Sequence, residues 1–128
     1  MDDRAFLAAF DDCTLPLSEL HHRGHLRAAF LLVRRGGPGA FVDGLRRYVR
    51  ALGKEAIYNE TLTQAWLALI AAAMQRAPSA TSLEALLADA PELADAHLPE
   101  RHYSRELLFS DAARAAFVAP DRSPLPSR

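Results

Sequence analysis

The feature that most constrains the fold is the helical spacing of the apolar residues, which capping and breaking residues interrupt at intervals. Apolar positions recur three or four residues apart before Arg35, again up to Leu52, and again between Glu60 and Arg76. The Gly36-Gly37-Pro38-Gly39 segment separates the first two runs, and Pro78 follows the third. No segment alternates apolar and polar residues between turns at hairpin spacing. We therefore predict an all-α fold, a compact single-domain bundle of about four main helices with additional short helices.

Capping residues give the expected helix boundaries. The predicted helices cover residues 3–11, Ser18 to Arg35, the segment after Gly39 up to Leu52, Glu60 to Arg76, residues 81–88 and residues 111–118. Ser18, Asn59 and Ser110 are the predicted N-caps, and Thr81-x-x-Glu84 has the pattern of a capping box. Pro91 to Leu98 is expected to hold another turn or two. The predicted domain is residues 1–118, followed by a Pro-rich tail, residues 119–128, either extended over the surface or disordered.

Composition and length narrow the class of protein. A chain of 128 residues fits one domain with a real core. The single cysteine, Cys13, cannot form an internal disulfide and is expected to behave as a small buried hydrophobe, so a cytoplasmic location is predicted. The acidic N-terminus does not resemble a signal peptide, and the longest apolar run, Ala65 to Met74, is about half of the roughly 20 residues that span a membrane.

Charge is distributed unevenly although the net charge is only −1. Between His21 and Lys54 the sequence has seven arginines, one lysine and one acid. Between Ala77 and Glu100 it has five acids and no base. Two interpretations stay open: solvated charges that offset each other, or a site for an anionic ligand. Nucleic acid ranks below both, because the pI is about 6.5 and the arginines do not form a basic stripe interleaved with aromatic residues. The acidic segment from Pro91 to Glu100 is expected to act as a lid.

Two histidines and one glutamate fall on the apolar side of the predicted helices. His22 and His25 are three residues apart near the start of one helix, and Glu60 opens another. If these helices pack together, the three side chains converge on one polar site. Two imidazoles and a carboxylate can hold one divalent metal, iron or zinc, and leave coordination positions for substrate. Glu60 and His22 are also the predicted catalytic groups.

Simpler explanations of these residues remain open. The histidines could be half-buried, hydrogen-bonded structural groups, or could act as acid and base without a metal. An acid in a first helical turn is favoured by the helix dipole, although Glu60 does not occupy the capping-box position. Thr61 and Thr63 are expected to orient a neighbouring carboxylate or imidazole. The predicted substrate contacts are Arg23, Arg27, Thr63 and Tyr103.

His97 and His102 are weaker candidates. His97 lies in the acidic, Pro-flanked segment and is predicted to be solvent-exposed. His102 precedes Tyr103 and Ser104, and it could supply a third imidazole if this segment folds over the helices. Motifs for nucleotide phosphates, serine hydrolases and zinc ribbons are absent from the sequence.

Three short motifs resemble those of a family of small uncharacterised bacterial proteins. The motifs are Thr14-Leu15-Pro16, then His22-Arg23-Gly24-His25-Leu26, then Tyr58-Asn59-Glu60-Thr61-Leu62-Thr63. The segments Tyr103-Ser104 to Leu108, Ser110, Ala113-Arg114 and Pro120-Asp121 are similar to the C-terminal portion of that family. This chain has Asn59 where the family usually has histidine. The resemblance implies a shared site but no established activity.

These features lead to one preferred function and one alternative. The preferred prediction is a small metal-dependent enzyme, with His22, His25 and Glu60 at the metal, that acts on a small polar or anionic metabolite. The alternative is a non-catalytic helical module that binds a small ligand or a protein partner. Neither prediction includes nucleic acid or a membrane, and a homodimer is left open.

Overall fold

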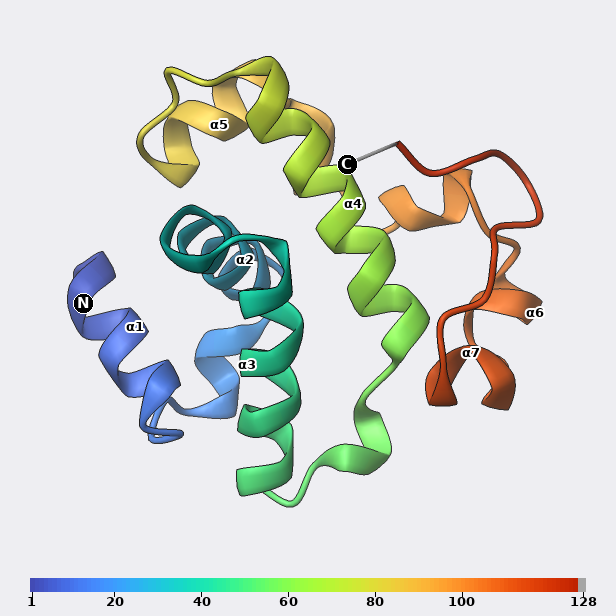
Figure 1. The fold of residues 1–128 in the computed structure, drawn as a ribbon, viewed down its shortest axis with the longest axis horizontal. Coiled ribbons are helices and arrows are strands. Elements are labelled where there is room, and N and C mark those ends of the chain that lie inside the picture. Colours follow the sequence, from blue (N-terminus) through green and yellow to red (C-terminus); the bar gives the residue numbers. More distant parts are fainter. Residues whose placement is uncertain (127–128) are drawn as a thin grey trace. The chain divides into compact units, whose positions relative to one another are not determined.

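The computed structural model describes residues 1–126, which contain helices and no strands (Figure 1). The α-helices are α1 (Asp3–Asp11), α2 (His22–Gly36), α3 (Pro38–Ala51), α4 (Glu60–Arg76), α5 (Leu83–Asp89), α6 (Arg105–Leu108) and α7 (Asp111–Ala115). The 3-10 helices are η1 (Leu17–Leu20), η2 (Glu55–Ile57), η3 (Pro91–Ala94) and η4 (Leu98–Arg101). The predicted all-α class is confirmed.

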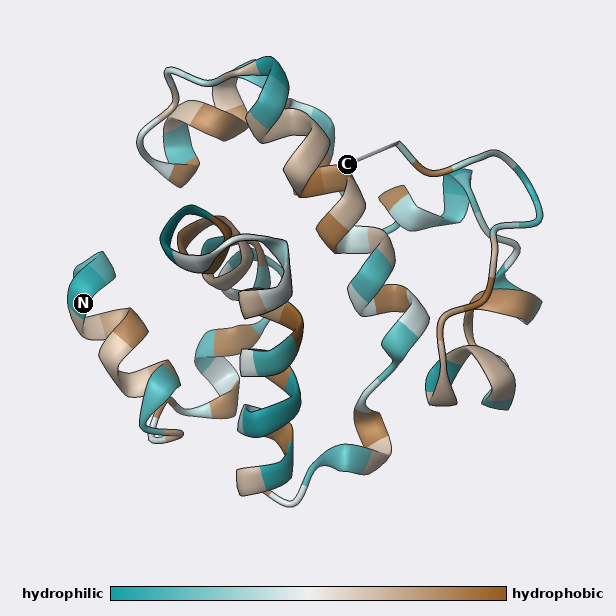
Figure 2. Cartoon of the chain, in the orientation of Figure 1, coloured by the Kyte–Doolittle hydropathy of each residue, from teal (hydrophilic) through white to brown (hydrophobic). Residues whose placement is uncertain are grey.

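Contacts within the chain form two compact units, Met1–Tyr58 and Asn59–Arg128, and each unit is described by itself. In the first unit α1, α2 and α3 pack against one another. Each of these helices has an apolar and a polar side, as the hydropathy colouring of α3 shows (Figure 2). Tyr48 is fully buried, stacks on Phe10 with ring centroids 5.1 Å apart, and donates its hydroxyl hydrogen to the carbonyl of Leu15. This contact ties the α1–η1 connection to α3.

The second helix begins later than the sequence predicts. Instead of one helix from Ser18 to Arg35, the chain forms η1 and then restarts as α2 at His22. Gly24 permits this break, because a Cβ added there would lie 2.0 Å from the carbonyl oxygen of Glu19. This local close approach of the η1 backbone to α2 leaves no mark in the spacing of the apolar residues, so that spacing could not predict it.

The break between α2 and α3 is where the sequence predicts it. Gly37 ends α2 with a φ of 83°, a conformation that favours glycine, and its backbone N–H donates to the carbonyl of Val33. Pro38 then opens α3 at a position where its missing N–H costs nothing. Gly53, with a φ of 66°, directly follows the end of α3.

The second unit is organised around α4. Asn59 caps this helix as predicted, since its side-chain oxygen accepts a hydrogen bond from the N–H of Leu62 at 2.9 Å. Its amide nitrogen also donates to the carbonyl of Leu108 at 2.8 Å, so this one side chain holds α6 next to the start of α4. Within the unit α4 contacts α5, η4 and α7.

In the second unit two predicted boundaries need correction, and one short helix was not predicted. Ser82 and not Thr81 caps α5, because the Ser82 hydroxyl accepts from the N–H of Ala85. The last helix is capped by Ser110 as predicted but ends at Ala115 and not at Val118. The short α6, which Ser104 caps, was not predicted because four residues are too few to show a helical period.

Beyond α7 the chain runs without helix along the second unit and is anchored by hydrogen bonds. We call residues 116–126 the C-terminal segment. The hydroxyl of Thr61 donates to the carbonyl of Ala116 and accepts from the N–H of Val118. The carboxylate of Asp121 accepts from the N–H of Ser104 at 2.7 Å. The predicted tail is therefore extended and hydrogen-bonded over its described part, and residues 127–128 lie outside the described residues.

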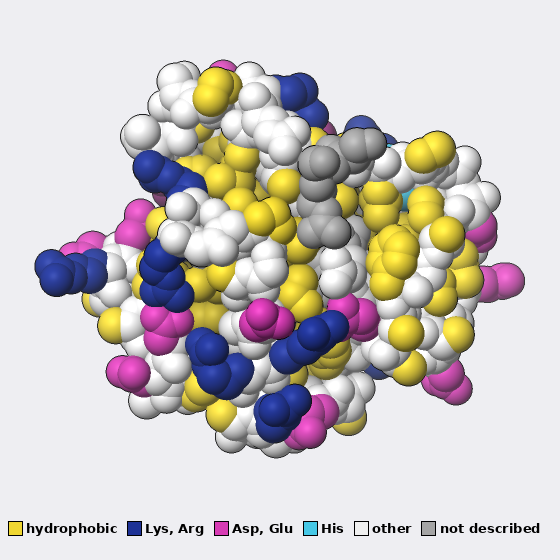
Figure 3. All heavy atoms as spheres, in the orientation of Figure 1, with side chains coloured by type: hydrophobic (Ala, Val, Ile, Leu, Met, Phe, Trp, Pro, Cys, Tyr) yellow, Lys and Arg dark blue, Asp and Glu magenta, His cyan; other side chains and the backbone are white. Residues whose placement is uncertain are grey.

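Charged side chains find many of their partners inside their own unit. In the first unit Asp11 pairs with Arg35 and Arg47, and Asp3 pairs with Arg27. Figure 3 shows Lys and Arg side chains in dark blue interspersed with acidic side chains in magenta. Three arginines of the segment that could have bound an anionic ligand are thus paired with acidic side chains of the same unit. Over residues 1–126, no helix is both long and apolar enough to cross a membrane.

Candidate functional site

The predicted histidine pair lies at the start of α2. His21, the residue before the helix, makes no side-chain capping hydrogen bond, and His22 and His25 follow on the first turn. Burial, together with smaller contributions from charge repulsion by His22 and His21, lowers the pKa of His25 from 6.5 to about 4. His25 is therefore neutral at physiological pH, which is the form of imidazole that binds metals.

Glu60 opens α4 in the second unit and is buried, with 6% of its surface exposed. One carboxylate oxygen accepts a hydrogen bond from the amide of Gln64 at 2.9 Å. The prediction that this side chain is not on the solvent-facing side of its helix is confirmed. A carboxylate is seldom buried without a functional or structural reason.

The expectation that Thr61 and Thr63 orient other site residues is not met. The Thr63 hydroxyl donates to the carbonyl of Asn59, one turn earlier in its own helix. The Thr61 hydroxyl holds the C-terminal segment through Ala116 and Val118. Hydroxyls on a helix readily bond to nearby backbone carbonyls. The spacing of residues along the sequence does not indicate which carbonyl accepts the hydrogen bond.

The predicted substrate contacts are dispersed over both units. Arg27 donates to Asp3 and to the carbonyl of Met1, and its guanidinium lies 4.5 Å from the centre of the Phe6 ring. Tyr103 is fully buried and donates its hydroxyl hydrogen to the carbonyl of Val118 at 2.6 Å. Both residues thus have structural contacts in place of an open ligand-facing position. Arg23 is exposed on the first turn of α2.

The predicted metal centre draws on both units. His22 and His25 belong to the first unit and Glu60 to the second, so their convergence stays a prediction. Among residues 1–126 the structure groups no three His, Cys, Asp or Glu side chains in a way that could hold a metal ion. His102 contacts Ser123 and the carbonyl of Pro124 through its Nδ1 only, and such a bond leaves Nε2 as the ring nitrogen that can bind a metal, so its role as a third imidazole stays a prediction.

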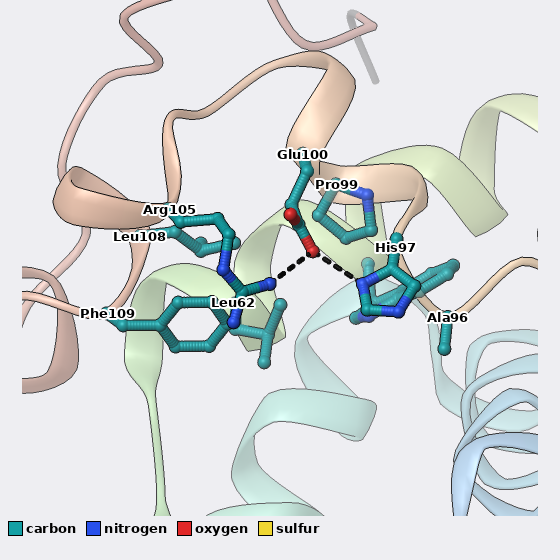
Figure 4. A pocket seen from close by; sticks show the side chains of 9 residues that line it. Leu62, Ala96, His97, Pro99, Glu100, Arg105, Leu108 and Phe109 are labelled. Atoms are coloured by element: carbon teal, nitrogen blue, oxygen red, sulfur yellow. Dashed lines mark hydrogen bonds and ion pairs between the residues drawn. The ribbon is translucent and has the colours of Figure 1, made fainter.

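A pocket of about 180 Å³ lies wholly within the second unit (Figure 4). Its walls are mostly apolar, and three polar side chains line it. The apolar residues are Leu62, Trp66, Ala96, Pro99, Leu108 and Phe109, and the polar ones are His97, Glu100 and Arg105. They come from α4, from the acidic segment with η4, and from α6 and the residue after it. The predicted lid segment thus supplies one wall of the pocket.

Glu100 is the acidic residue of this pocket, and the other two polar side chains both contact it. One of its oxygens, Oε2, accepts from Nδ1 of His97 at 2.7 Å and from Nη1 of Arg105 at 3.0 Å (Figure 4). These two hydrogen bonds lower the pKa of Glu100, so the carboxylate is ionised at neutral pH. Within residues 1–126 the other oxygen, Oε1, has no hydrogen-bond partner. The pocket therefore offers an ionised acceptor beside apolar walls.

Arg105 is held by two contacts that leave part of its guanidinium available. Besides Glu100 it contacts the Phe109 ring, whose centre lies 5.1 Å from the guanidinium carbon. Only Nη1 is engaged by a hydrogen bond in the described part of the chain, so Nη2 and Nε can still donate. A cationic donor and an anionic acceptor thus lie side by side at this pocket.

Sequence reasoning missed Trp66, Glu100, Arg105 and Phe109. Two signals were present: His97 and Glu100 are three residues apart, and Arg105 and Phe109 are four apart, the spacings at which side chains meet on a helix. Each pair is confined to a very short helical segment, however, so neither pattern stood out. The prediction that His97 is exposed is confirmed, with 73% of its side chain accessible to solvent.

Comparison with known proteins adds no assignment. No protein-family model, no curated protein and no solved structure matches this chain. The comparisons therefore leave the class of this chain as its fold defines it, an all-α protein. The resemblance to the family of small bacterial proteins stays a prediction.

Proposed function

We propose that this protein is a helical module that binds a small organic molecule in the pocket of its second unit. One observation carries the proposal: the ionised Glu100 has an unused acceptor oxygen in a pocket with apolar walls. Ligand sites commonly combine apolar walls with a few placed polar groups. Drug-sized ligands occupy roughly 300–1,000 Å³, so a pocket of about 180 Å³ suits a smaller molecule.

Ligand-observed NMR with a library of small neutral, anionic, cationic and zwitterionic fragments tests this function. Ala96 is exposed at the pocket, so Ala96→Phe should fill the pocket without disturbing the core. Ala94 is equally exposed but does not line the pocket, and Ala94→Phe is the matched control. We expect fragments that bind the wild type and Ala94→Phe but not Ala96→Phe. An absence of binding, or equal binding to Ala96→Phe, would contradict the proposal.

Metal-dependent catalysis is the second candidate, and the lowered pKa of His25 favours it. A histidine that stays neutral down to about pH 4 can bind a metal without first losing a proton. The sequence prediction adds His22 and Glu60 as further ligands of iron or zinc. Mass-spectrometric metal analysis of tag-free protein tests this candidate. It predicts near-stoichiometric metal in the wild type and in His97→Gln, and loss of metal in His25→Gln and Glu60→Gln. Metal-free wild-type protein would reject it.

A further inference from the structure

The ligand pocket contains two opposite charges beside a small apolar surface. The carboxylate of Glu100 and the guanidinium of Arg105 are joined by one 3.0 Å hydrogen bond. The side chain of Glu100 is 22% exposed and that of Arg105 is 64% exposed, so a ligand can contact both without a rearrangement of the protein. Figure 4 shows the two groups next to each other, with Leu62 and Phe109 close by. These positions limit the chemistry of a ligand that fits.

A ligand with a single charge meets an unfavourable neighbour in this pocket. An amine could donate to Oε1 of Glu100 but would come near the positive guanidinium. A carboxylate could accept from Nη2 or Nε of Arg105 but would come near the ionised Glu100. Like charges that close together cost binding free energy, whereas a ligand with both charges gains from both residues.

We infer that the pocket binds a zwitterionic α-amino acid with an apolar side chain. Its ammonium would donate to Oε1 of Glu100, and its carboxylate would accept from the free N–H groups of Arg105. The α-carbon holds the ligand's two charges about as close together as the Glu100–Arg105 pair. The existing hydrogen bond between Arg105 and Oε2 would remain, since neither ligand group needs those atoms.

The apolar part of the ligand has a surface to cover. Leu62 and Trp66 from α4 and Leu108 from α6 line the pocket together with Phe109, which is 40% exposed. Burying a small aliphatic group against them removes apolar surface from water, which favours binding. The size of the pocket favours a single amino acid over a peptide.

Trp66 provides the signal for a direct test, because it is the only tryptophan in the chain and it lines the pocket. Its fluorescence can be titrated with L-leucine and with two analogues that keep the leucine side chain: isopentylamine, which lacks the carboxylate, and 4-methylpentanoate, which lacks the amine. We expect L-leucine to bind at least about tenfold more tightly than either analogue, since each analogue lacks one of the two charged hydrogen bonds.

Two variants assign the charges to their residues. Glu100→Gln should lower L-leucine affinity about tenfold and leave 4-methylpentanoate binding unchanged or stronger. Arg105→Gln should lower L-leucine affinity similarly and leave isopentylamine binding unchanged or stronger. Glu106→Gln and Arg101→Gln are matched controls, because both residues are exposed and neither lines the pocket. A circular-dichroism spectrum equal to that of the wild type shows that each variant is folded.

This inference rests on the proposed ligand pocket, and the two can fail separately. If fragments bind in the pocket but L-leucine binds no more tightly than its one-charge analogues, the inference is wrong and the pocket stands. Unchanged L-leucine affinity in Glu100→Gln and Arg105→Gln also overturns the inference. If neither L-leucine nor any fragment binds the wild type, both proposals are wrong.

Discussion

At the scale of single residues, Gly24 shows how one missing side chain shapes the first unit. The carbonyl of Glu19 in η1 approaches Gly24 so closely that a Cβ there would lie 2.0 Å away, well inside contact distance. The backbone can therefore form η1 and then restart as α2. Glycine usually weakens a helix, so its presence on the first turn of α2 indicates that this close approach is needed.

Replacing Gly24 by alanine should destabilise the protein by roughly 1–3 kcal/mol, the usual cost of forcing extra atoms into a packed site. Gly39→Ala is the matched control, because nothing lies within 4 Å of a Cβ added at that position in α3. This control should be neutral or stabilising by up to about 1 kcal/mol. Urea unfolding measures both variants. Equal free energies of unfolding for the two would show that the contact with Glu19 does not constrain position 24.

His25 makes stability depend on pH in a known direction. The pKa of His25 is about 4 in the folded protein, whereas an unperturbed histidine, as in the unfolded chain, has a pKa of 6.5. The unfolded chain therefore binds a proton more readily than the folded protein. The neutral side chain therefore contributes fully above pH 6.5, and this contribution is lost as the pH falls towards 4. The loss is up to about 1.4 kcal/mol per pH unit within that window.

Comparing the wild type with His25→Gln isolates this effect, because the carboxylates titrate alike in both proteins. The free energy of unfolding should fall more between pH 7.5 and pH 5 in the wild type than in His25→Gln, by about 1–2 kcal/mol. Urea titrations at the two pH values give the difference. Parallel curves would mean that the His25 imidazole is not kept neutral by folding.

At the scale of secondary-structure elements, the sequence predicted the helices that carry their own start and stop signals. Gly37 and Pro38 separate α2 from α3, and Asn59 starts α4, because each of these features acts within a few residues. The pocket was not predictable in the same way. Glu100 and Arg105 become a site only when short segments pack against α4, and that packing leaves no periodic pattern in the sequence.

The cap of α4 can be separated into its two hydrogen bonds. Asn59→Ser keeps an oxygen that can accept from Leu62 but loses the donor to the carbonyl of Leu108, and Asn59→Ala loses both. We expect Asn59→Ala to cost about 2–3 kcal/mol, since a cap contributes about 1 kcal/mol and an unsatisfied buried carbonyl adds to the loss. Ser82→Ala, which removes a simple cap from α5, should cost about 1 kcal/mol.

Chemical denaturation of these variants gives the order of stability directly. Ser82→Ala should be more stable than Asn59→Ala, and Asn59→Ser should lie between Asn59→Ala and the wild type. An Asn59→Ala variant no less stable than Ser82→Ala would show that the bond to Leu108 contributes nothing to the second unit.

At the scale of the whole molecule, each of the two units has its own polar links and its own buried residues. Tyr48 joins the α1–η1 connection to α3 in the first unit. In the second unit Thr61 and Tyr103 bind the backbone of the C-terminal segment. Composition predicted a Pro-rich tail, but it could not predict these bonds, since they depend on which backbone groups the folded unit leaves accessible.

The anchoring of the C-terminal segment can be tested with an isosteric pair. Thr61→Val removes the hydroxyl that bonds Ala116 and Val118, so it should lower stability by about 1–3 kcal/mol and speed hydrogen exchange in residues 116–124. Thr63→Val removes a hydroxyl that bonds only within its own helix, so exchange in that segment should not change. Unaltered exchange in Thr61→Val would mean that other contacts hold the segment.

The central claim is that the second unit binds a small molecule between α4 and the segments around Glu100 and Arg105. The most direct measurement is a two-dimensional ¹H–¹⁵N NMR titration of the wild type with L-leucine or with the tightest fragment. We expect saturable shifts of the single indole N–H signal, from Trp66, and of the amides of His97, Glu100, Arg105 and Phe109, all absent in Ala96→Phe. Saturable shifts that map elsewhere, or that persist unchanged in Ala96→Phe, would contradict the central claim.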